Sequence, residues 1–269
     1  MRSLDRNFIN TELYLFLGIL MNLSWASDFS YGYFRKILQT VNSNFKICLL
    51  SQAPYIVEGL NKSKLILRHD VDVSLKRALI MARIEKDFGI RATYMVMTES
   101  LLYCIEDDTS HDILQKMIDM GHEIGLHIDP CSFETDSIEA KINSACKRLK
   151  KIIGRRVLAV SFHQPPEKYQ RGHLTIGNRV NAYAERLMEW YLSDSSGCWK
   201  YGEPLPKLSR PEKSLLQMLI HPIWWGDEHM SREERLRAFV LEETRGKPPD
   251  CAKILRSDII KTIGVKFDL

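Results

Sequence analysis

Residues 65–72 read Leu-Ile-Leu-Arg-His-Asp-Val-Asp, a short apolar run that leads into charged and histidine side chains. An unbroken apolar run of this length is typical of a parallel strand that is buried on both faces. Apolar residues then recur at helical spacing over residues 75–88, and Gly89 ends that pattern. Residues 92–97 form the next apolar run, so this stretch predicts a strand, a helix and a second, parallel strand.

The same alternation continues along the chain with short connections. Further helices are expected at residues 28–46, 111–120, 137–153 and 232–243, and further strands at residues 122–127, 157–162, 191–193 and 216–220. We see no internal repeat and no linker rich in Pro, Gly or Ser. The pattern predicts an α/β fold built on a parallel sheet or barrel. It also predicts one domain over residues 28–269, after an N-terminal apolar or helical extension over residues 1–27.

Composition narrows the class of protein. With 45% hydrophobic residues, the 269-residue chain has enough apolar surface to fold, which argues against a disordered or fibrous protein. Its 38 basic and 34 acidic residues give a net charge of +4, too balanced to indicate a nucleic-acid partner. The six cysteines form no Cys-x-x-Cys pair, so reduced thiols are expected.

The N-terminus allows two interpretations. Residues 13–20 are an apolar run, with Arg2 and Arg6 before it and a small-x-small sequence at Ser24-Trp-Ala26. A signal peptide over residues 1–26 would have these features, but the acidic Glu12 directly before the run argues against one. We therefore expect a cytoplasmic protein, with the signal peptide as the open alternative. The apolar run would also suit peripheral contact with a membrane. It is too short for a typical membrane-spanning helix.

Potentially catalytic side chains follow nearly every expected strand. Carboxyl ends of parallel strands meet at one side of a sheet or barrel, which is where active sites form. Aspartate and histidine supply the oxygen and imidazole donors of a zinc or similar divalent-metal site. The sequence therefore predicts one shared site at the strand ends, formed by His69, Asp70, Asp72, His127, Asp129, His163, Asp194 and His221.

Each of these residues alone has a simpler explanation. Asp70 and Asp72 would suit the cap of the following helix, and His127 would suit a buried, hydrogen-bonded position. His163 and His221 each come just before proline-containing turns. We favour the shared site because so many separate explanations at the same end of successive strands are less probable than one.

The other histidines are interpreted differently. His122 lies five residues before His127, so the two side chains point to opposite faces of a strand, and we interpret His122 as structural. No role is assigned to the remaining histidines His111, His173 and His229, nor to the charged residues 227–269 as a whole.

Over residues 60–226 the sequence resembles the polysaccharide deacetylase family, also called the NodB-homology or carbohydrate esterase family 4 class. Five motifs occur in the family's order, and the second is the most specific of them. They are Arg68-His-Asp-Val-Asp72, Gly121-His-Glu-Ile-Gly-Leu-His127, Ser161-Phe-His-Gln-Pro165, Asp194-Ser-Ser-Gly-Cys-Trp199 and Leu219-Ile-His221.

The resemblance implies an irregular (β/α)7-type barrel, a divalent metal that is commonly zinc, and hydrolysis of an N-acetyl or O-acetyl group on a sugar. Asp72 and His127 would bind the metal and Asp70 would be the general base. His221 would be the general acid, and Asp194 would orient it. Trp199 and Trp225 would contact sugar rings, for which core packing is the alternative.

Two departures from the family's pattern leave the third metal ligand open. The usual second imidazole, four residues after the first, is missing, and Cys131 takes its place. His163 stands where the third motif usually has an arginine that pairs with the catalytic aspartate. The third ligand is therefore His163, Asp129 or Cys131. We favour His163, because it restores a set of two imidazoles and one carboxylate, and we assign Asp129 to substrate binding.

The resemblance, with the polar residues at the strand ends, therefore implies a metal-dependent carbohydrate deacetylase. By analogy with the family, its substrate would be an acetylated amino sugar, a glycan or a lipid-linked sugar in the synthesis of a cell-surface polysaccharide or glycolipid. One alternative is a deformylase or another amidohydrolase on the same scaffold. The other is a non-catalytic glycan-binding relative, which the missing imidazole would favour.

Overall fold

The computed structural model describes residues 28–56, 62–130 and 137–269, and the predicted extension over residues 1–27 lies outside this part. Its centre is a nine-stranded sheet in the order β6-β7-β5-β4-β3-β2-β9-β8, with β1 paired to β2 off this path. Within the described residues every pair is parallel except β6 with β7. The strands are β1 (Lys46–Cys48), β2 (Lys64–Val71), β3 (Thr93–Met97), β4 (Glu123–Ile128), β5 (Ala159–Phe162), β6 (Thr175–Ile176), β7 (Arg179–Asn181), β8 (Tyr191–Ser193) and β9 (Leu215–Ile220).

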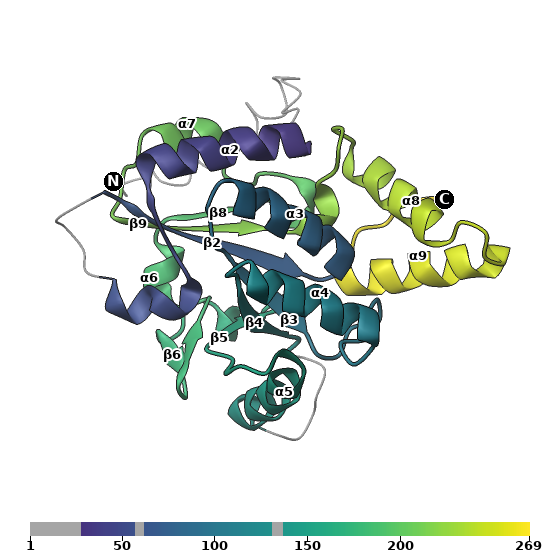
Figure 1. Cartoon of the computed structure of the whole chain (residues 1–269), viewed down its shortest axis with the longest axis horizontal. Helices are drawn as coiled ribbons and strands as arrows, with labels where there is room; N and C mark the ends of the chain where they lie inside the picture. Colours follow the sequence, from purple (N-terminus) through teal and green to yellow (C-terminus); the bar gives the residue numbers. More distant parts are fainter. Residues whose placement is uncertain (1–27, 57–61, 131–136) are drawn as a thin grey trace, which may run out of the picture.

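The sheet curls into a half-barrel with β6 and β8 as its edges, and helices pack around it (Figure 1). The predicted α/β class and barrel-like architecture are confirmed. The helices are α2 (Tyr31–Asn44), α3 (Leu75–Asp87), α4 (Asp108–Asp119), α5 (Ile138–Ile153), α6 (Glu185–Met188), α7 (Pro204–Ser209), α8 (Arg232–Glu243) and α9 (Pro249–Ile263).

Local sequence explains where these elements begin and end. Ser74 is the N-cap of α3 and accepts a hydrogen bond from the Arg77 amide, so this cap does not require Asp70 or Asp72. Strand β2 runs on through Arg68, His69 and Asp70, farther than the apolar residues alone indicate. The polar residues of this motif are therefore fixed on a buried strand.

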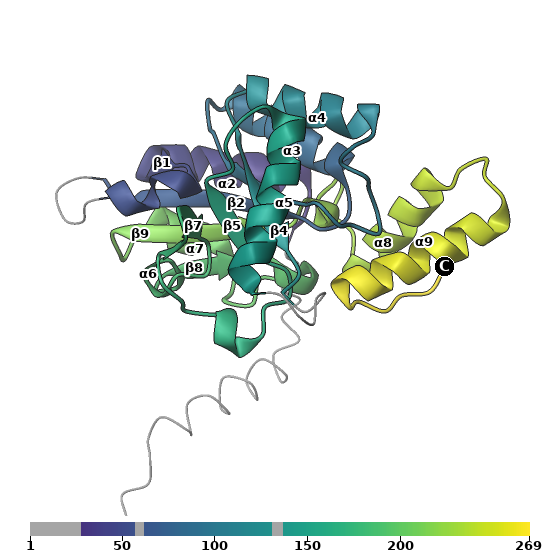
Figure 2. The same cartoon turned by 90° about the horizontal axis from the view of Figure 1, so that it is seen from below.

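The C-terminal helices α8 and α9 form a hairpin on one side of the sheet (Figure 2). A capping box of Ser231 and Glu234 starts α8, and Gly264, at φ 71°, ends α9. The end of α9 returns to the body of the molecule (Figure 1), where Ile259 and Thr262 are buried. The sequence analysis identified α8 but missed α9.

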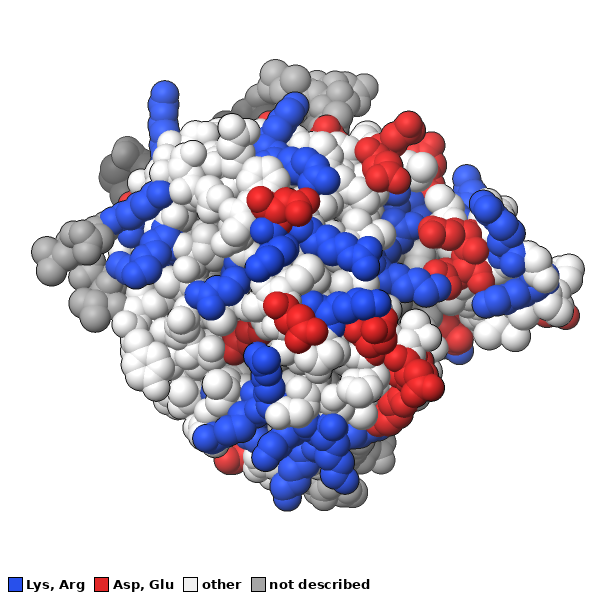
Figure 3. Space-filling model, viewed as in Figure 1, with Lys and Arg blue, Asp and Glu red and all other residues white. Residues whose placement is uncertain are grey.

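Two features bear on possible partners of the protein: the distribution of surface charge and the character of the helices. On the face shown in Figure 3, Lys and Arg side chains are interleaved with Asp and Glu. In the described ranges, none of the helices has the length and apolar character needed to cross a bilayer.

Candidate active site

The carboxyl ends of five strands bring the predicted polar residues together. Strands β5, β4, β3, β2, β9 and β8 are consecutive neighbours in the sheet, so residues far apart in sequence meet at one side of it. The contributors are Asp70 and Asp72 from β2 and its end, His127 from β4, and His163, Asp194 and His221 directly after β5, β8 and β9.

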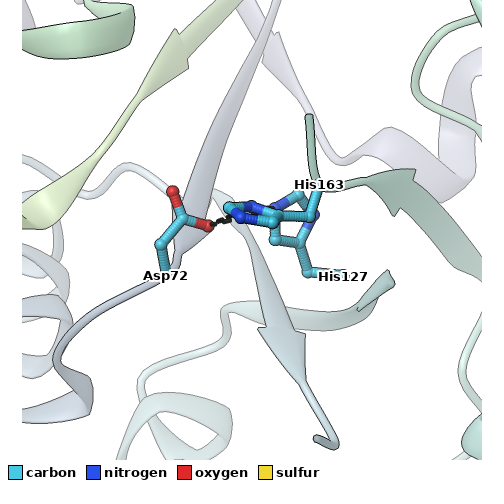
Figure 4. A group of neighbouring side chains, drawn as sticks. All are labelled: Asp72, His127 and His163. Atoms are coloured by element: carbon cyan, nitrogen blue, oxygen red, sulfur yellow. Dashed lines mark hydrogen bonds and ion pairs between the residues drawn. The ribbon is translucent and has the colours of Figure 1, made fainter. Parts of the chain in front are cut away.

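Asp72, His127 and His163 form a tight, buried group (Figure 4). Asp72 Oδ1 lies 3.0 Å from His127 Nε2 and 3.4 Å from His163 Nδ1. The two imidazole nitrogens are 3.3 Å apart. Within the described ranges these are the three side chains that converge as a candidate metal set. Asp129 is not part of it, and Cys131 lies outside the described residues.

The donor set fits a divalent metal. Ligands at about 2.0–2.1 Å from a tetrahedral ion lie roughly 3.3 Å from one another, close to the separations found here. The outer ring nitrogens have partners of their own: Ser161 Oγ at 2.7 Å from His127 Nδ1, and the Thr262 carbonyl at 2.7 Å from His163 Nε2. Asp72 Oδ1 is buried, and it faces the two inner imidazole nitrogens. Outer-shell contacts of this kind orient imidazoles that bind metals.

Electrostatics also favours a cation at this position. Burial alone would lower the pKa of His163, but Asp72 and the Thr262 carbonyl raise it to about 9. Burial alone would raise the pKa of Asp72, but His127 and His163 hold it well below its usual value. The carboxylate is therefore ionised, and the negative charge that favours a proton on His163 equally favours a metal ion.

Asp70 has a partner that the sequence analysis missed. Arg68 donates two hydrogen bonds to its carboxylate, from Nε at 2.8 Å and Nη2 at 2.6 Å. Both side chains are almost completely buried, and the Arg68 guanidinium lies 4.7 Å from the centre of the Tyr183 ring. Burial alone would raise the pKa of Asp70, but Arg68 and His127 lower it, so Asp70 is an ionised carboxylate.

Arg68 thus takes the place of the third-motif arginine that this chain lacks. The spacing of Arg68 and Asp70 in the sequence could have indicated this pair. Residues two apart on a strand point to the same side, so Arg68 and Asp70 were bound to be neighbours once β2 extended through both.

His221 is held by a second carboxylate. Its Nδ1 lies 2.6 Å from Asp194 Oδ1, and its backbone amide donates to the same carboxylate. The Trp225 indole donates to Asp194 Oδ2 at 2.9 Å. The free nitrogen, Nε2, points towards the metal set, 3.9 Å from Asp72 Oδ2. Burial alone would lower the pKa of His221, but Asp194 raises it to about 9, with help from Asp72 and Asp70.

These groups open onto one cavity of about 380 Å³. Asp70, Asp72, His127, His163 and His221 all line it. The lining also includes five aromatic residues, Phe162, Tyr183, Tyr191, Tyr201 and Trp224. The arrangement places an ionised carboxylate, a protonated imidazole and a metal set around a space large enough for a sugar residue.

Three residues that were predicted to contact the substrate do not line this cavity. Trp225 is 0% exposed and contributes through its bond to Asp194, and Trp199 is 7% exposed and packs against Phe29 and Trp225. Both tryptophans are thus packed in the core, which was the alternative to contact with a sugar. Asp129 lines a neighbouring cavity of about 300 Å³, which shares His127 and His163 with the first.

His122 has the structural position that was expected. It is buried on the opposite face of the chain from the site, where it accepts a hydrogen bond from the Ala92 amide and contacts the Ala82 carbonyl.

Comparisons with known proteins give distant matches. No family model and no curated protein matches the chain. Solved structures do match, among them a family 4 carbohydrate esterase from Bacillus anthracis, with 16% identity over 88% of each chain and a TM-score of 0.38. The chain is similar to carbohydrate esterases of family 4.

Two further matches carry related names. The family 4 esterase domain of a xylanase from the hindgut metagenome of Trinervitermes trinervoides is 14% identical over 77% of this chain and 87% of that domain, with a TM-score of 0.42. The Streptococcus pyogenes deacetylase PplD, solved with acetate, is 16% identical with a TM-score of 0.39. That match covers 48% of this chain and 60% of the Streptococcus protein, so it spans less than two thirds of the length of that protein.

Proposed function

We propose that this protein is a metal-dependent hydrolase that removes an acetyl group from a sugar nitrogen or oxygen. One observation carries the proposal: a three-ligand metal set, a carboxylate held by arginine and an imidazole held by carboxylate line the same cavity of about 380 Å³. A purely structural cluster would have no need of all three arranged around open space.

Asp72, His127 and His163 would hold the metal, and zinc suits a set of two imidazoles and one carboxylate. When bound, such an ion supplies Lewis acidity, which polarises an acyl carbonyl and makes water a stronger acid. The ring nitrogens left for it are His127 Nε2 and His163 Nδ1, because the other nitrogen of each ring has a partner in the protein.

Asp70 acts as the general base. It lies 3.7 Å from His127 Nε2, and so beside the metal set, and it accepts the proton of the attacking water. Arg68 keeps this carboxylate ionised and fixes its orientation through two hydrogen bonds. A base that is held in place loses little entropy when the reaction occurs.

His221 acts as the general acid. Its pKa of about 9 keeps it protonated at neutral pH, and Nε2 is the nitrogen that faces the cavity. It donates its proton to the leaving amine or alcohol as the acyl bond breaks. Asp194 holds Nδ1 throughout, so the ring keeps its orientation.

The substrate is an acetylated amino sugar, either free, in a glycan or on a lipid carrier. The aromatic wall of Tyr183, Tyr191 and Tyr201 supports a sugar, because aromatic faces pack on the apolar faces of sugar rings and the hydroxyl groups accept or donate hydrogen bonds. We place its role in the synthesis of a cell-surface polysaccharide or glycolipid and its location in the cytoplasm. Both are extensions of the sequence prediction.

The test is product release from defined substrates. Protein loaded with zinc, cobalt or nickel is incubated with N-acetylglucosamine oligomers, a nucleotide-linked N-acetyl sugar, O-acetylated xylan and an N-formyl amino sugar. Acetate release that disappears in Asp70→Asn is expected. Formate release alone would identify a deformylase. Tight glycan binding without release of either acid would contradict the proposal.

A further inference from the structure

The two nitrogens of the His163 ring face different parts of the chain. Nδ1 points into the metal set, 3.4 Å from Asp72 Oδ1. Nε2 points away from it and lies 2.7 Å from the backbone carbonyl of Thr262. A carbonyl oxygen only accepts hydrogen bonds, so Nε2 carries a proton, and Nδ1 is the nitrogen whose lone pair becomes available when a metal replaces the second proton of the ring.

The Thr262 carbonyl belongs to the last turn of α9. Carbonyls in a last helical turn have no partner within the helix. The Gly264 amide bonds back to Ile260, and the Thr262 carbonyl accepts from His163 and from Gln164 Nε2 at 3.0 Å. Two consecutive side chains after β5 therefore donate hydrogen bonds to the same carbonyl, in a helix about 100 residues farther along the chain.

The residue after His163 has an unusual backbone conformation. Gln164 has φ 43°, a left-handed conformation that is unfavourable for a residue with a side chain. Such a conformation is strained and persists where surrounding contacts require it. Here those contacts are the two hydrogen bonds from His163 and Gln164 to the Thr262 carbonyl.

The end of α9 is anchored in turn. Ile259, Thr262, Val265 and Phe267 are buried. The Thr262 hydroxyl donates to the Asp258 carbonyl at 2.8 Å, within the helix. Arg256 donates to the carbonyl of Phe267, so the segment after the helix folds back on it. The carbonyl that meets His163 thus has a fixed position.

We propose that the C-terminal end of α9 is part of the metal centre, with the Thr262 carbonyl as the positioning group for the third ligand. It holds His163 in the Nε2–H tautomer, so the metal is bound through Nδ1, whereas His127 binds through Nε2. The negative end of the α9 dipole strengthens this hydrogen bond and makes Nδ1 a better donor. The inference rests on the proposed function only in requiring that a metal binds at this site.

The first test reads the tautomer directly. The full chain is labelled with ¹⁵N-histidine and loaded with ¹¹³Cd²⁺, and the coupling between the metal and each ring nitrogen is measured by NMR. We expect coupling to His163 Nδ1 and His127 Nε2, with a slowly exchanging proton on His163 Nε2. His163→Gln and His127→Gln assign the signals. Coupling to His163 Nε2 overturns the inference while leaving the proposed function intact. No coupling to His163 overturns the inference and also removes His163 from the proposed metal set.

The second test weakens the carbonyl itself. Cys251 allows residues 251–269 to be joined as a synthetic peptide to residues 1–250, which restores the full chain. An ester in place of the 262–263 peptide bond makes the Thr262 carbonyl a poorer acceptor. An ester at 259–260 is the matched control, because it removes a helical N–H from the same helix and leaves the Thr262 carbonyl unchanged.

We expect the 262–263 ester to weaken Zn²⁺ affinity roughly 10–100-fold, as outer-shell changes usually do, and the control ester to leave it within about twofold. Melting temperatures of both metal-free proteins report the helix damage that they share. Equal affinity in both, or equal loss in both, overturns the inference. No metal bound by the unmodified chain would overturn the proposed function as well.

Discussion

Two buried clusters of histidine and carboxylate lie beside each other along β2, and only one of them has the properties of an active site. His69 Nε2 lies 2.5 Å from Glu85 Oε1, and the Tyr94 hydroxyl donates to Glu85 Oε2 at 2.8 Å. Three residues on from His69, Asp72 meets His127 and His163. Alternation along the strand sends His69 to the helix α3 side and Asp70 to the side of the site.

The difference lies in what surrounds each carboxylate. His69, Glu85 and Tyr94 are each 0% exposed, and both Glu85 oxygens are used within the cluster. Asp72 and its histidines are buried as well, but they line a cavity, and the Asp72 carboxylate faces two imidazoles rather than one. A buried histidine beside a carboxylate is therefore not evidence of chemistry. Convergence of several such groups on a cavity is.

The largest expected effect concerns catalysis. Asp70→Asn removes the proton acceptor but keeps an oxygen for Arg68, so kcat/KM for deacetylation should fall roughly 10²–10⁴-fold with unchanged zinc content. Steady-state acetate release and elemental analysis measure the two quantities, and a melting curve confirms folding. A loss of less than tenfold would show that Asp70 is not the base.

The next effect concerns stability. Glu85→Ala leaves the buried donors of His69 and Tyr94 without an acceptor, at about 1–3 kcal/mol each, so the free energy of unfolding should fall by roughly 2–6 kcal/mol. Zinc content of the folded fraction should not change. Urea unfolding measures the loss. Glu243→Ala, which breaks the partly exposed pair with Lys76, is the control and should cost under about 1 kcal/mol. Loss of zinc from folded Glu85→Ala protein would erase the distinction between the clusters.

The smallest effect is a shift in pH dependence. His221 acts in its protonated form, so activity should fall as pH rises through its pKa of about 9. Asp194→Asn removes the main group that raises this pKa, and burial then lowers it, so the alkaline limb should move to lower pH. Trp225→Phe, which removes one hydrogen bond to Asp194, should move it less. The pH profile of kcat/KM decides, and an unmoved limb in Asp194→Asn would exclude His221 as the acid.

The sequence alone predicted most of the fold because its strands are continuous apolar runs separated by well-formed helices. It also predicted that Asp72, His127 and His163 would meet, since residues at the ends of parallel strands share one side of the sheet. Trp225 is buried and bonded to Asp194, and the sequence could not distinguish this from a wall position, since an aromatic residue beside a motif suits both. Arg68 was overlooked because the strand was expected to end at Leu67.

The role of α9 was beyond the reach of sequence reasoning for a different reason. The group that contacts His163 is a backbone carbonyl, and every residue has one. Only the packing of the end of α9 against the segment after β5 selects Thr262. The helix itself left signals, with Pro249 at its start and Gly264 at its end, but its partner could not be deduced from them.

Metal content is the most direct test of the central claim that Asp72, His127 and His163 form a metal centre. Elemental analysis of the purified protein, after incubation with Zn²⁺ and removal of excess, is compared with the same measurement on Asp72→Ala, His127→Ala, His163→Ala and Asp129→Ala. Near-stoichiometric metal in the wild type and in Asp129→Ala, lost in the other three, is the predicted result. No metal in the wild type with zinc, cobalt or nickel, or full retention in His163→Ala, would contradict it.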